Sequence, residues 1–277
     1  MIKQRVITAL ILAPLMIIGI FFLPLHFFAV FIAVIAAVGA WEWANMAGYS
    51  AQGQRIGYAA VVLLCLLTSP MIPDFLIYYL GLGGLWWLLA FVLVKRYPGG
   101  TTVWKSAWIR AVLGLLVLIP MWGGFVYLKQ VTHSSLLILL VMLIIWGADT
   151  GAYFAGKKWG KAKLAPNVSP GKSWAGFWGG MATSLAVGVI FGLCIDLWVH
   201  PLAMLEQVQL LMVVALTTVV SVLGDLLESM MKRYRGIKDS SALLPGHGGV
   251  LDRIDSMAAA VPVFALCVYW MNWEWMS

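Results

Sequence analysis

The sequence has little charge, because only 10% of its 277 residues are Asp, Glu, Lys or Arg, against about 25% in soluble domains. Cysteine is also scarce. Cys65, Cys194 and Cys267 each stand alone in an apolar run, which excludes a CxxC metal site and a disulfide framework. The alternation of polar and apolar residues that is typical of membrane β-barrel strands is missing as well. With 62% hydrophobic residues, the chain is expected to be an integral membrane protein and not a soluble enzyme, a disordered chain or a secreted module.

Long apolar runs predict about nine transmembrane helices, because each helical span needs about 20 apolar residues. We expect spans at 6–24, 26–46, 57–72, 75–94, 106–127, 135–155, 174–198, 207–230 and 256–275. The third and fourth are the least distinct, since Pro70 and Pro73 could make one broken hairpin of them. The predicted fold class is therefore all-α, a polytopic integral membrane protein.

The basic residues predict the orientation of the chain. If the N-terminus is cytoplasmic, all of the 18 Lys and Arg residues except Lys129 fall on cytoplasmic segments. Basic residues near span ends favour the cytoplasmic side of a membrane. The net charge of +7 then indicates inner loops and anionic lipid head groups, not nucleic acid. We expect a multi-pass protein of the inner (cytoplasmic) cell membrane with its active site facing the cytoplasm.

The acidic residues divide the chain into two regions. Of the 11 acids, only Glu42 and Asp74 lie within residues 1–145. We interpret 1–145 as a transmembrane scaffold that faces lipid or a second copy, and 146–277 as the catalytic region. Two cytoplasmic loops are predicted in the catalytic region, at 156–173 and 231–255.

Four acids at the cytoplasmic ends of the last two spans are candidate metal ligands. Asp225 and Glu228 share one helix face because residues i and i+3 are neighbours, and Asp252 and Asp255 repeat that spacing. Acids in membrane helices are costly, so each needs a partner or a function. An ion pair of Glu228 with Lys232, and helix capping by Asp252 or Asp255, are the alternatives. The function that we expect is binding of Mg²⁺, which takes carboxylate oxygens and keeps positions for substrate phosphates.

A basic and glycine-rich segment separates these two pairs of acids. It contains Lys232, Arg233, Lys238 and Asp239, followed by Pro-Gly-His-Gly-Gly at 245–249. A basic run alone indicates lipid head groups, but glycines also let backbone N–H groups approach a phosphate. His247 could be a general base, a phosphate donor or a packing residue. Metal-binding acids, basic side chains and a glycine-rich loop together favour phosphoryl or nucleotidyl transfer.

The other predicted loop contains Ser169-Pro-Gly-Lys172-Ser. This is not a Walker A motif, because Pro166 stands where glycine is required and a membrane helix precedes the loop. Lys172 just before a helix N-terminus suits an anion, although a plain turn into the helix is an equal alternative. Asp149, at the end of a span, has three open roles: a cap, a partner for a neighbouring lysine, or a metal ligand.

Residues 229–255 closely resemble the signature of the phosphatidate cytidylyltransferase (CDP-diacylglycerol synthase) family. The pattern S-x-x-K-R-x4-K-D, a short spacer and P-G-H-G-G-x-x-D-R-x-D occurs here in full. Segments 149–153 and 164–173 are also similar to the family, whereas Ala175 departs from it, since many members have a polar or acidic residue there. The strong resemblance covers about 146–262.

The resemblance implies a dimeric, all-helical membrane enzyme that joins CTP to phosphatidic acid, giving CDP-diacylglycerol and pyrophosphate. It also implies a requirement for Mg²⁺, with a second cation such as K⁺ at the same acids. With the patterns above, the candidate catalytic residues are Asp225, Lys232, Arg233, Lys238, Asp239 and His247. The candidate substrate-binding residues are Ser169, Lys172, Ser229, Gly248, Gly249 and Arg253, and the candidate metal ligands are Asp225, Glu228, Asp252 and Asp255.

A cation transporter or channel is the alternative function, with Asp149, Asp225, Asp252 and Asp255 lining its path. A transporter predicts acids near the bilayer midplane, whereas these acids lie near the cytoplasmic ends of the spans. The motifs of two other lipid enzymes, D-G-x-x-A-R of the alcohol phosphatidyltransferases and D-D-x-x-D of the polyprenyl synthases, are absent from the sequence.

Overall fold

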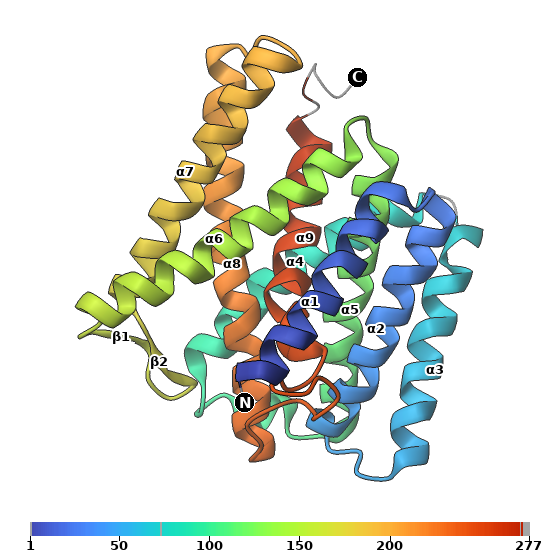
Figure 1. Cartoon of the computed structure of the whole chain (residues 1–277). Helices are drawn as coiled ribbons and strands as arrows, with labels where there is room; N and C mark the ends of the chain where they lie inside the picture. The colour runs from blue at the N-terminus through green and yellow to red at the C-terminus, as the bar shows by residue number, and fades with distance from the viewer. Residues whose placement is uncertain (1, 73, 272, 274–277) are drawn as a thin grey trace.

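The computed structural model describes residues 2–72, 74–271 and 273, with the backbone alone for 2–7, 9 and 11–13. Within these residues the chain forms nine α-helices and one β-hairpin (Figure 1). The helices are α1 (Ile2–Phe22), α2 (Leu25–Ala47), α3 (Gln52–Thr68), α4 (Phe75–Arg96), α5 (Ala107–Gln130), α6 (Ser134–Trp159), α7 (Trp174–Trp198), α8 (Met204–Arg235) and α9 (Leu251–Met271). Two short 3₁₀ helices, η1 (Ser69–Met71) and η2 (Thr101–Trp104), lie in connections.

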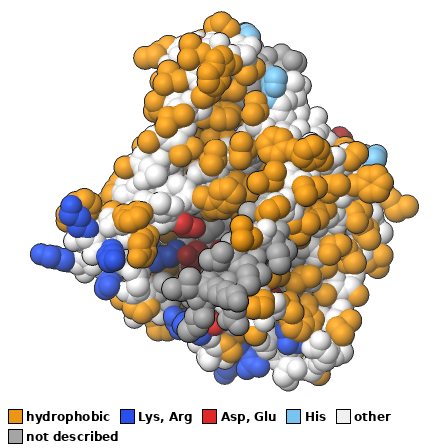
Figure 2. Space-filling model, viewed as in Figure 1, with side chains coloured by type: hydrophobic (Ala, Val, Ile, Leu, Met, Phe, Trp, Pro, Cys, Tyr) orange, Lys and Arg blue, Asp and Glu red, His pale blue; other side chains and the backbone are white. Residues whose placement is uncertain are grey.

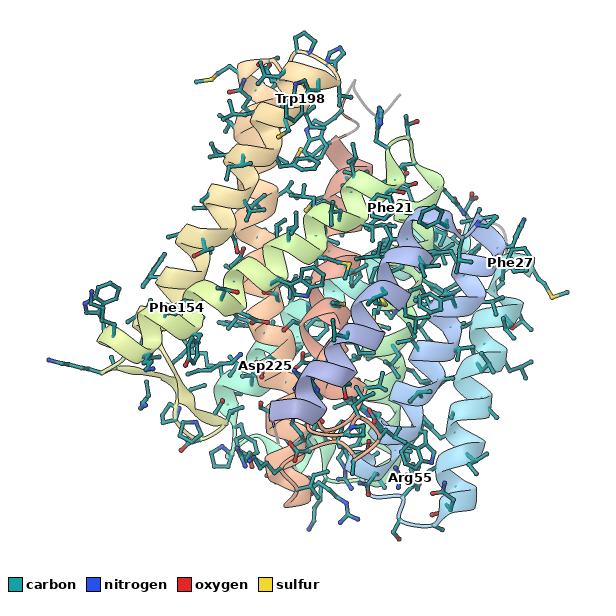
Figure 3. The ribbon with its side chains drawn as sticks, in the orientation of Figure 1. Phe21, Phe27, Arg55, Phe154, Trp198 and Asp225 are labelled. Carbon is teal, nitrogen blue, oxygen red and sulfur yellow. The ribbon has the colours of Figure 1, made fainter. Side chains whose placement is uncertain are left out.

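The helices present apolar side chains to the outside of the bundle. Phe27, Phe154 and Trp198 point outward in Figure 3 and are 68%, 66% and 79% exposed. Hydrophobic side chains also cover much of the face in Figure 2. Soluble monomers rarely expose apolar patches of this extent, whereas lipid accommodates them. In the described chain, α2 to α9 are long and apolar enough to cross a membrane. The all-α membrane class is thus confirmed; the number of crossings and the cytoplasmic N-terminus stay predictions.

Several helix boundaries differ from the predicted spans. Helix α8 continues to Arg235 instead of ending at 230, and α9 begins at Leu251 instead of 256. The predicted loop 231–255 therefore shrinks to 236–250. The physical reason is that polar residues at these helix ends, such as Lys232 and Asp252, have partners within the protein, so the helices continue through them. Residues 272, 274 and 275 of the last predicted span lie outside the described residues.

The connection between α6 and α7 is a hairpin rather than a turn. Strand β1 (Lys163–Ala165) pairs antiparallel with β2 (Ser169–Ser173), with Lys163 opposite Ser173. The Ser173 hydroxyl accepts a hydrogen bond from the N–H of Gly176 at 3.1 Å and so caps α7. Lys172 consequently stands on a strand that is anchored at both ends.

The two predicted regions share one packed core. Helix α9 packs against α4 and α5 as well as against α8. At Gly83 of α4 an added Cβ would lie 3.0 Å from Pro262 of α9, and Gly124 of α5 approaches the same proline. Small residues likewise allow α6 and α7 to pack closely, since a Cβ at Gly180 would lie 2.6 Å from the carbonyl oxygen of Ala148.

Candidate active site

The predicted functional loops meet at one end of the bundle. In Figure 1 the hairpin, the loop between α8 and α9, and the N-terminus of α1 lie at the same, lower end of the molecule. Figure 2 shows acidic side chains in a hollow of this region, with Lys and Arg side chains along its lower border. Charge of both signs is therefore gathered where the apolar surface ends.

Asp225 belongs to α8 and is labelled in the lower half of Figure 3. Its Oδ2 lies 2.7 Å from Lys172 Nζ, so an ion pair joins α8 to the hairpin. Ser229, one turn further along α8, donates a hydrogen bond to Asp225 Oδ1 at 3.1 Å. The side chains of Lys172 and Asp225 are 26% and 31% exposed, which leaves both within reach of a ligand.

Asp255 of α9 lies beside Asp225. A side chain at Gly224 would collide with the Asp255 carbonyl oxygen, so the two helices are in contact at this level. The charges of Asp225 and Asp255 act on each other. Asp255 Oδ1 accepts a hydrogen bond from the N–H of Ser256 at 2.6 Å. Two carboxylates from different helices thus face one region.

The other two acids are joined by one lysine. Lys232 Nζ lies 2.7 Å from Glu228 Oε2 and 2.6 Å from Asp252 Oδ1. These side chains are only 13%, 3% and 6% exposed, in the order Lys232, Glu228 and Asp252. The ion pair considered above as an alternative role for Glu228 is therefore present, and it includes Asp252 as well.

Asp252 also anchors the loop that precedes it. Its Oδ2 accepts hydrogen bonds from the N–H groups of Ser240 at 3.0 Å and Gly249 at 2.7 Å, and lies 2.9 Å from the Ser240 hydroxyl. With Lys232 on Oδ1, both oxygens already have partners. Asp252 therefore holds the loop by its hydrogen bonds, and it does not cap α9, since none of its N–H donors belongs to that helix.

The four acids do not form one cluster. Among the described residues, no three His, Cys, Asp or Glu side chains are placed to hold a single metal ion. Lys172 pairs with Asp225, and Lys232 pairs with both Glu228 and Asp252, while Asp255 lies near both Asp225 and Glu228. Convergence of all four on a shared ion is therefore not observed, and metal binding by individual acids stays a prediction. Among the oxygens of these four acids, Glu228 Oε1 is buried without a hydrogen-bond partner in the described part of the chain.

The glycines of the 236–250 loop allow close approach to acids. Gly248 has φ +82°, and a Cβ there would lie 2.7 Å from Asp252 Oδ2. A Cβ at Gly249 would collide with Ser240 Oγ, while its N–H is already bonded to Asp252. Packing alone therefore explains why residue 249 is a glycine, and the predicted phosphate nest is not needed to explain it. His247 Nδ1 is buried without a hydrogen-bond partner among the described atoms.

The remaining candidate residues lie around this end of the molecule. Arg233 donates from Nε to the carbonyl oxygen of Val168 at 3.3 Å, which ties α8 to the hairpin turn. Lys238, Asp239 and Arg253 are exposed, and Ser169 is half-buried in β2. The structure thus brings Lys172 and Ser229 into direct contact with Asp225 and leaves Lys238, Asp239 and Arg253 exposed.

Two neighbouring cavities lie next to the hairpin. One, of about 430 Å³, lies between α6, α7 and the hairpin and is lined by Asp149, Lys157 and Lys172. The other, of about 540 Å³, lies between α4, α7 and α8 and is mostly apolar, with Lys95 and Asn167 among its lining residues. Both cavities are lined by Leu164, Phe177 and Val222, so one wall separates a charged space from an apolar one.

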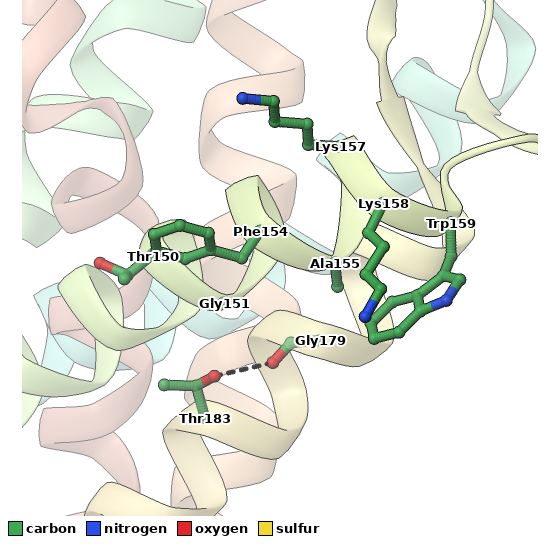
Figure 4. Close-up of a pocket in the computed structure, with 9 residues that line it drawn as sticks. All are labelled: Thr150, Gly151, Phe154, Ala155, Lys157, Lys158, Trp159, Gly179 and Thr183. Carbon is green, nitrogen blue, oxygen red and sulfur yellow. Dashed lines mark hydrogen bonds between the residues drawn. The ribbon is translucent and has the colours of Figure 1, made fainter.

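A third hollow, of about 660 Å³, lies on α6 and α7 (Figure 4). Its lining includes Lys158, Trp159 and Thr183, whose hydroxyl donates to the Gly179 carbonyl oxygen at 2.9 Å. None of the predicted site residues lines this hollow.

Glu42 of α2 is the residue of this region that the sequence analysis missed. It is fully buried, and its carboxylate accepts hydrogen bonds from the N–H groups of Val250 and Leu251 at the start of α9. A signal existed in the sequence, because an acid inside an apolar span needs a partner or a function. It was counted among the acids but not assigned a role.

Lysines and carboxylates gathered at one end of an apolar helix bundle define a membrane enzyme that handles charged groups. The chain belongs to the cytidylyltransferase family, whose model matches residues 3–271. It is 50% identical over 273 residues to the phosphatidate cytidylyltransferase of Pseudomonas aeruginosa, with 99% of both chains covered. It is 37% identical over 291 residues to that of Haemophilus influenzae, covering 96% of this chain and 98% of the relative.

These similarities confirm the resemblance seen in residues 229–255 and identify a nucleotidyltransferase. They also extend it to the first 145 residues, where the sequence analysis found agreement in hydropathy alone. The transporter alternative receives no support from them.

Proposed function

We propose that the protein transfers the cytidylyl group of CTP to phosphatidic acid, giving CDP-diacylglycerol and pyrophosphate. An oxygen of the lipid phosphate forms a bond to the α-phosphorus of CTP while the bond from that phosphorus to the pyrophosphate oxygen breaks. Pyrophosphate leaves with the electron pair. The observation that carries the proposal is the Lys172–Asp225 pair, whose lysine lines a cavity that shares one wall with a mostly apolar cavity, in a chain 50% identical to a phosphatidate cytidylyltransferase.

The chemistry requires charge neutralisation more than proton transfer. The lipid phosphate is already anionic near pH 7, so the attacking oxygen needs no strong general base. Two anions must instead be brought together, and fixed cations near the phosphates are the usual means. Lys172 is held at the site by Asp225 and would turn to the triphosphate when CTP binds. Under this mechanism His247 binds or orients a phosphate and does not remove a proton.

We propose magnesium as the cofactor. The donor atoms fit it, because Mg²⁺ binds through one or two carboxylates and keeps other positions for water and phosphate. Asp225 and Asp255 would hold it, since Asp225 is 31% exposed and can exchange Lys172 for a metal ion, whereas the side chain of Asp252 is only 6% exposed. When bound, Mg²⁺ would neutralise charge on the triphosphate. The partnerless Glu228 Oε1 would suit a second cation such as K⁺.

The two cavities suit two different substrates. An apolar space of about 540 Å³ beside the membrane helices fits acyl chains of phosphatidic acid, with Lys95 near its lipid phosphate. The charged cavity fits a nucleotide that arrives from water. This division supports an active site at the inner leaflet of the cytoplasmic membrane, facing the cytoplasm. We further propose a homodimer, which light scattering of the detergent-purified protein would test.

The proposal is tested with purified protein, labelled CTP, phosphatidic acid and Mg²⁺. We expect label in a lipid-soluble nucleotide, release of pyrophosphate, and loss of both when EDTA removes Mg²⁺. Diacylglycerol, which lacks the attacking phosphate, is the matched control and should give no product. Pyrophosphate release with diacylglycerol, or no lipid product with phosphatidic acid, would contradict the proposed reaction.

A further inference from the structure

The carboxylate of Glu42 joins the first region of the chain to the loop of the proposed active site. Oε1 accepts hydrogen bonds from the Val250 N–H at 2.9 Å and the Ser241 hydroxyl at 2.5 Å. Oε2 accepts from the Leu251 N–H at 2.6 Å and lies 3.2 Å from Ser240 Oγ. Each oxygen therefore receives one backbone N–H, and each has a serine hydroxyl beside it.

These contacts make Glu42 the N-terminal cap of α9 in place of a residue of α9 itself. The first N–H groups of a helix lack partners within the helix, and an anion near them is favourable. Here the anion comes from α2, and Glu42 precedes Leu251 by 209 residues in the chain. The start of α9 is thus placed relative to α2, and Asp252 and Asp255 follow within its first turns.

Ser240 links Glu42 to Asp252 directly. Its hydroxyl lies between Glu42 Oε2 and Asp252 Oδ2, at 3.2 and 2.9 Å, and it is 1% exposed. A single hydroxyl proton is thus available to two carboxylates. Thr8 of α1 also holds this loop, by donating to the Pro245 carbonyl oxygen at 3.0 Å. The first region of the chain therefore sets the position of the loop from two helices.

We propose that Glu42 is a positioning residue for nucleotidyl transfer: it fixes the 240–251 segment, and with it the start of α9, so that Asp255 is held beside Asp225. The inference rests on the proposed function, because it assigns these acids to that reaction. Glu42 itself does not touch the reacting atoms.

Replacement of Glu42 by Gln gives a sharp test, because the two side chains have the same size. A Gln side chain has one acceptor oxygen, so its NH₂ group must face the N–H of Val250 or Leu251, donor against donor. We expect E42Q to lower kcat/KM at least tenfold, with a raised half-saturating concentration of Mg²⁺ or CTP. The rate of backbone amide hydrogen exchange should increase in residues 240–251 and stay at the parent level in the helices away from this segment.

Glu206→Gln is the matched control. Glu206 also accepts an N–H at a helix start, from Ala203 at 3.0 Å, but with one oxygen only. It lies about 40 Å along α8 from Lys232, at 1.5 Å per residue. We expect E206Q to keep the kinetics of the parent.

Ser240→Ala tests the link between the two carboxylates and keeps the proposal falsifiable if E42Q does not fold. It should shift the same kinetic constants in the same direction, and the double variant should be less impaired than the sum of the two. Parent-like kinetics of E42Q, or of Ser240→Ala, would overturn the proposal. So would a loss explained entirely by less folded protein with exchange raised uniformly. An inactive parent enzyme would instead refute the proposed function.

Discussion

The two pairs of acids have the same chemistry and opposite surroundings. Glu228 and Asp252 are nearly fully buried and share Lys232. Asp225 is about one-third exposed and has Lys172 and Ser229 as partners, and Lys172 lines a cavity. Buried carboxylates that share a buried lysine hold the structure, whereas a partly exposed carboxylate paired to a partly exposed lysine can exchange that partner for a substrate.

The largest effect is expected on stability, from the loss of the lysine that Glu228 and Asp252 share. Lys232→Met leaves two buried carboxylates without their counter-ion, and breaking a buried ion pair from one side costs about 3–5 kcal/mol. The midpoint of thermal unfolding, followed by tryptophan fluorescence in detergent, should fall sharply. Lys161→Met, at an exposed lysine, is the control and should leave the midpoint unchanged. An unchanged midpoint for Lys232→Met would remove the distinction between the pairs.

Asp225→Asn tests the partly exposed ion pair of Lys172 with Asp225. The change preserves side-chain size but removes the charge, and loss of an electrostatic group at a reacting phosphate costs about 100-fold in turnover. Stability should change little, because a partly exposed ion pair contributes about 0–1 kcal/mol. Asp252→Asn is the comparison and should lower both turnover and the unfolding midpoint. Full turnover of Asp225→Asn would contradict the proposed role.

Lys172→Ala should act on one substrate more than on the other. A hydrogen bond to a charged group contributes about 1.5–3 kcal/mol, so the KM for CTP should rise about tenfold or more. The KM for phosphatidic acid should change much less. Steady-state kinetics in mixed micelles measures both, with the exposed Lys163→Ala as control. Equal increases for both substrates would indicate a distorted hairpin instead.

The smallest effect is expected from Ser229→Ala, which removes the hydrogen bond to Asp225 and leaves the ion pair. One such bond contributes about 0.5–1.5 kcal/mol, so turnover should fall by about two- to tenfold. Ser221→Ala, on the same helix, removes a hydroxyl that bonds only to the Thr218 carbonyl oxygen at 2.8 Å and serves as control. A loss as large as that of Asp225→Asn would assign Ser229 a direct role.

Much of the site could be predicted because local spacing determines it. The i, i+4 pair Glu228–Lys232 and the i, i+4 contact of Ser229 with Asp225 are properties of one helix. The contacts of Lys172 with Asp225 and of Lys232 with Asp252 could not be derived, since they depend on how α8 meets the hairpin and α9. The hairpin itself was missed because its strands are short and lack an alternating apolar pattern.

Glu42 marks the limit of such reasoning most clearly. Its position in an apolar span required a partner, yet nothing local named Ser240 or Leu251, which lie about 200 residues away. The same holds for Gly249, because Ser240 and Glu42 leave no room for a side chain there, and these contacts are set by the fold.

Apolar run length and charge distribution by themselves determined an all-helical membrane protein whose acids are concentrated after residue 145, because burial in lipid and helix periodicity are local constraints. Only the tertiary structure decided which acids are neutralised by lysines and which stay accessible, and that the cap of α9 comes from α2. Those outcomes depend on distances between side chains of different helices, and helix packing sets these distances.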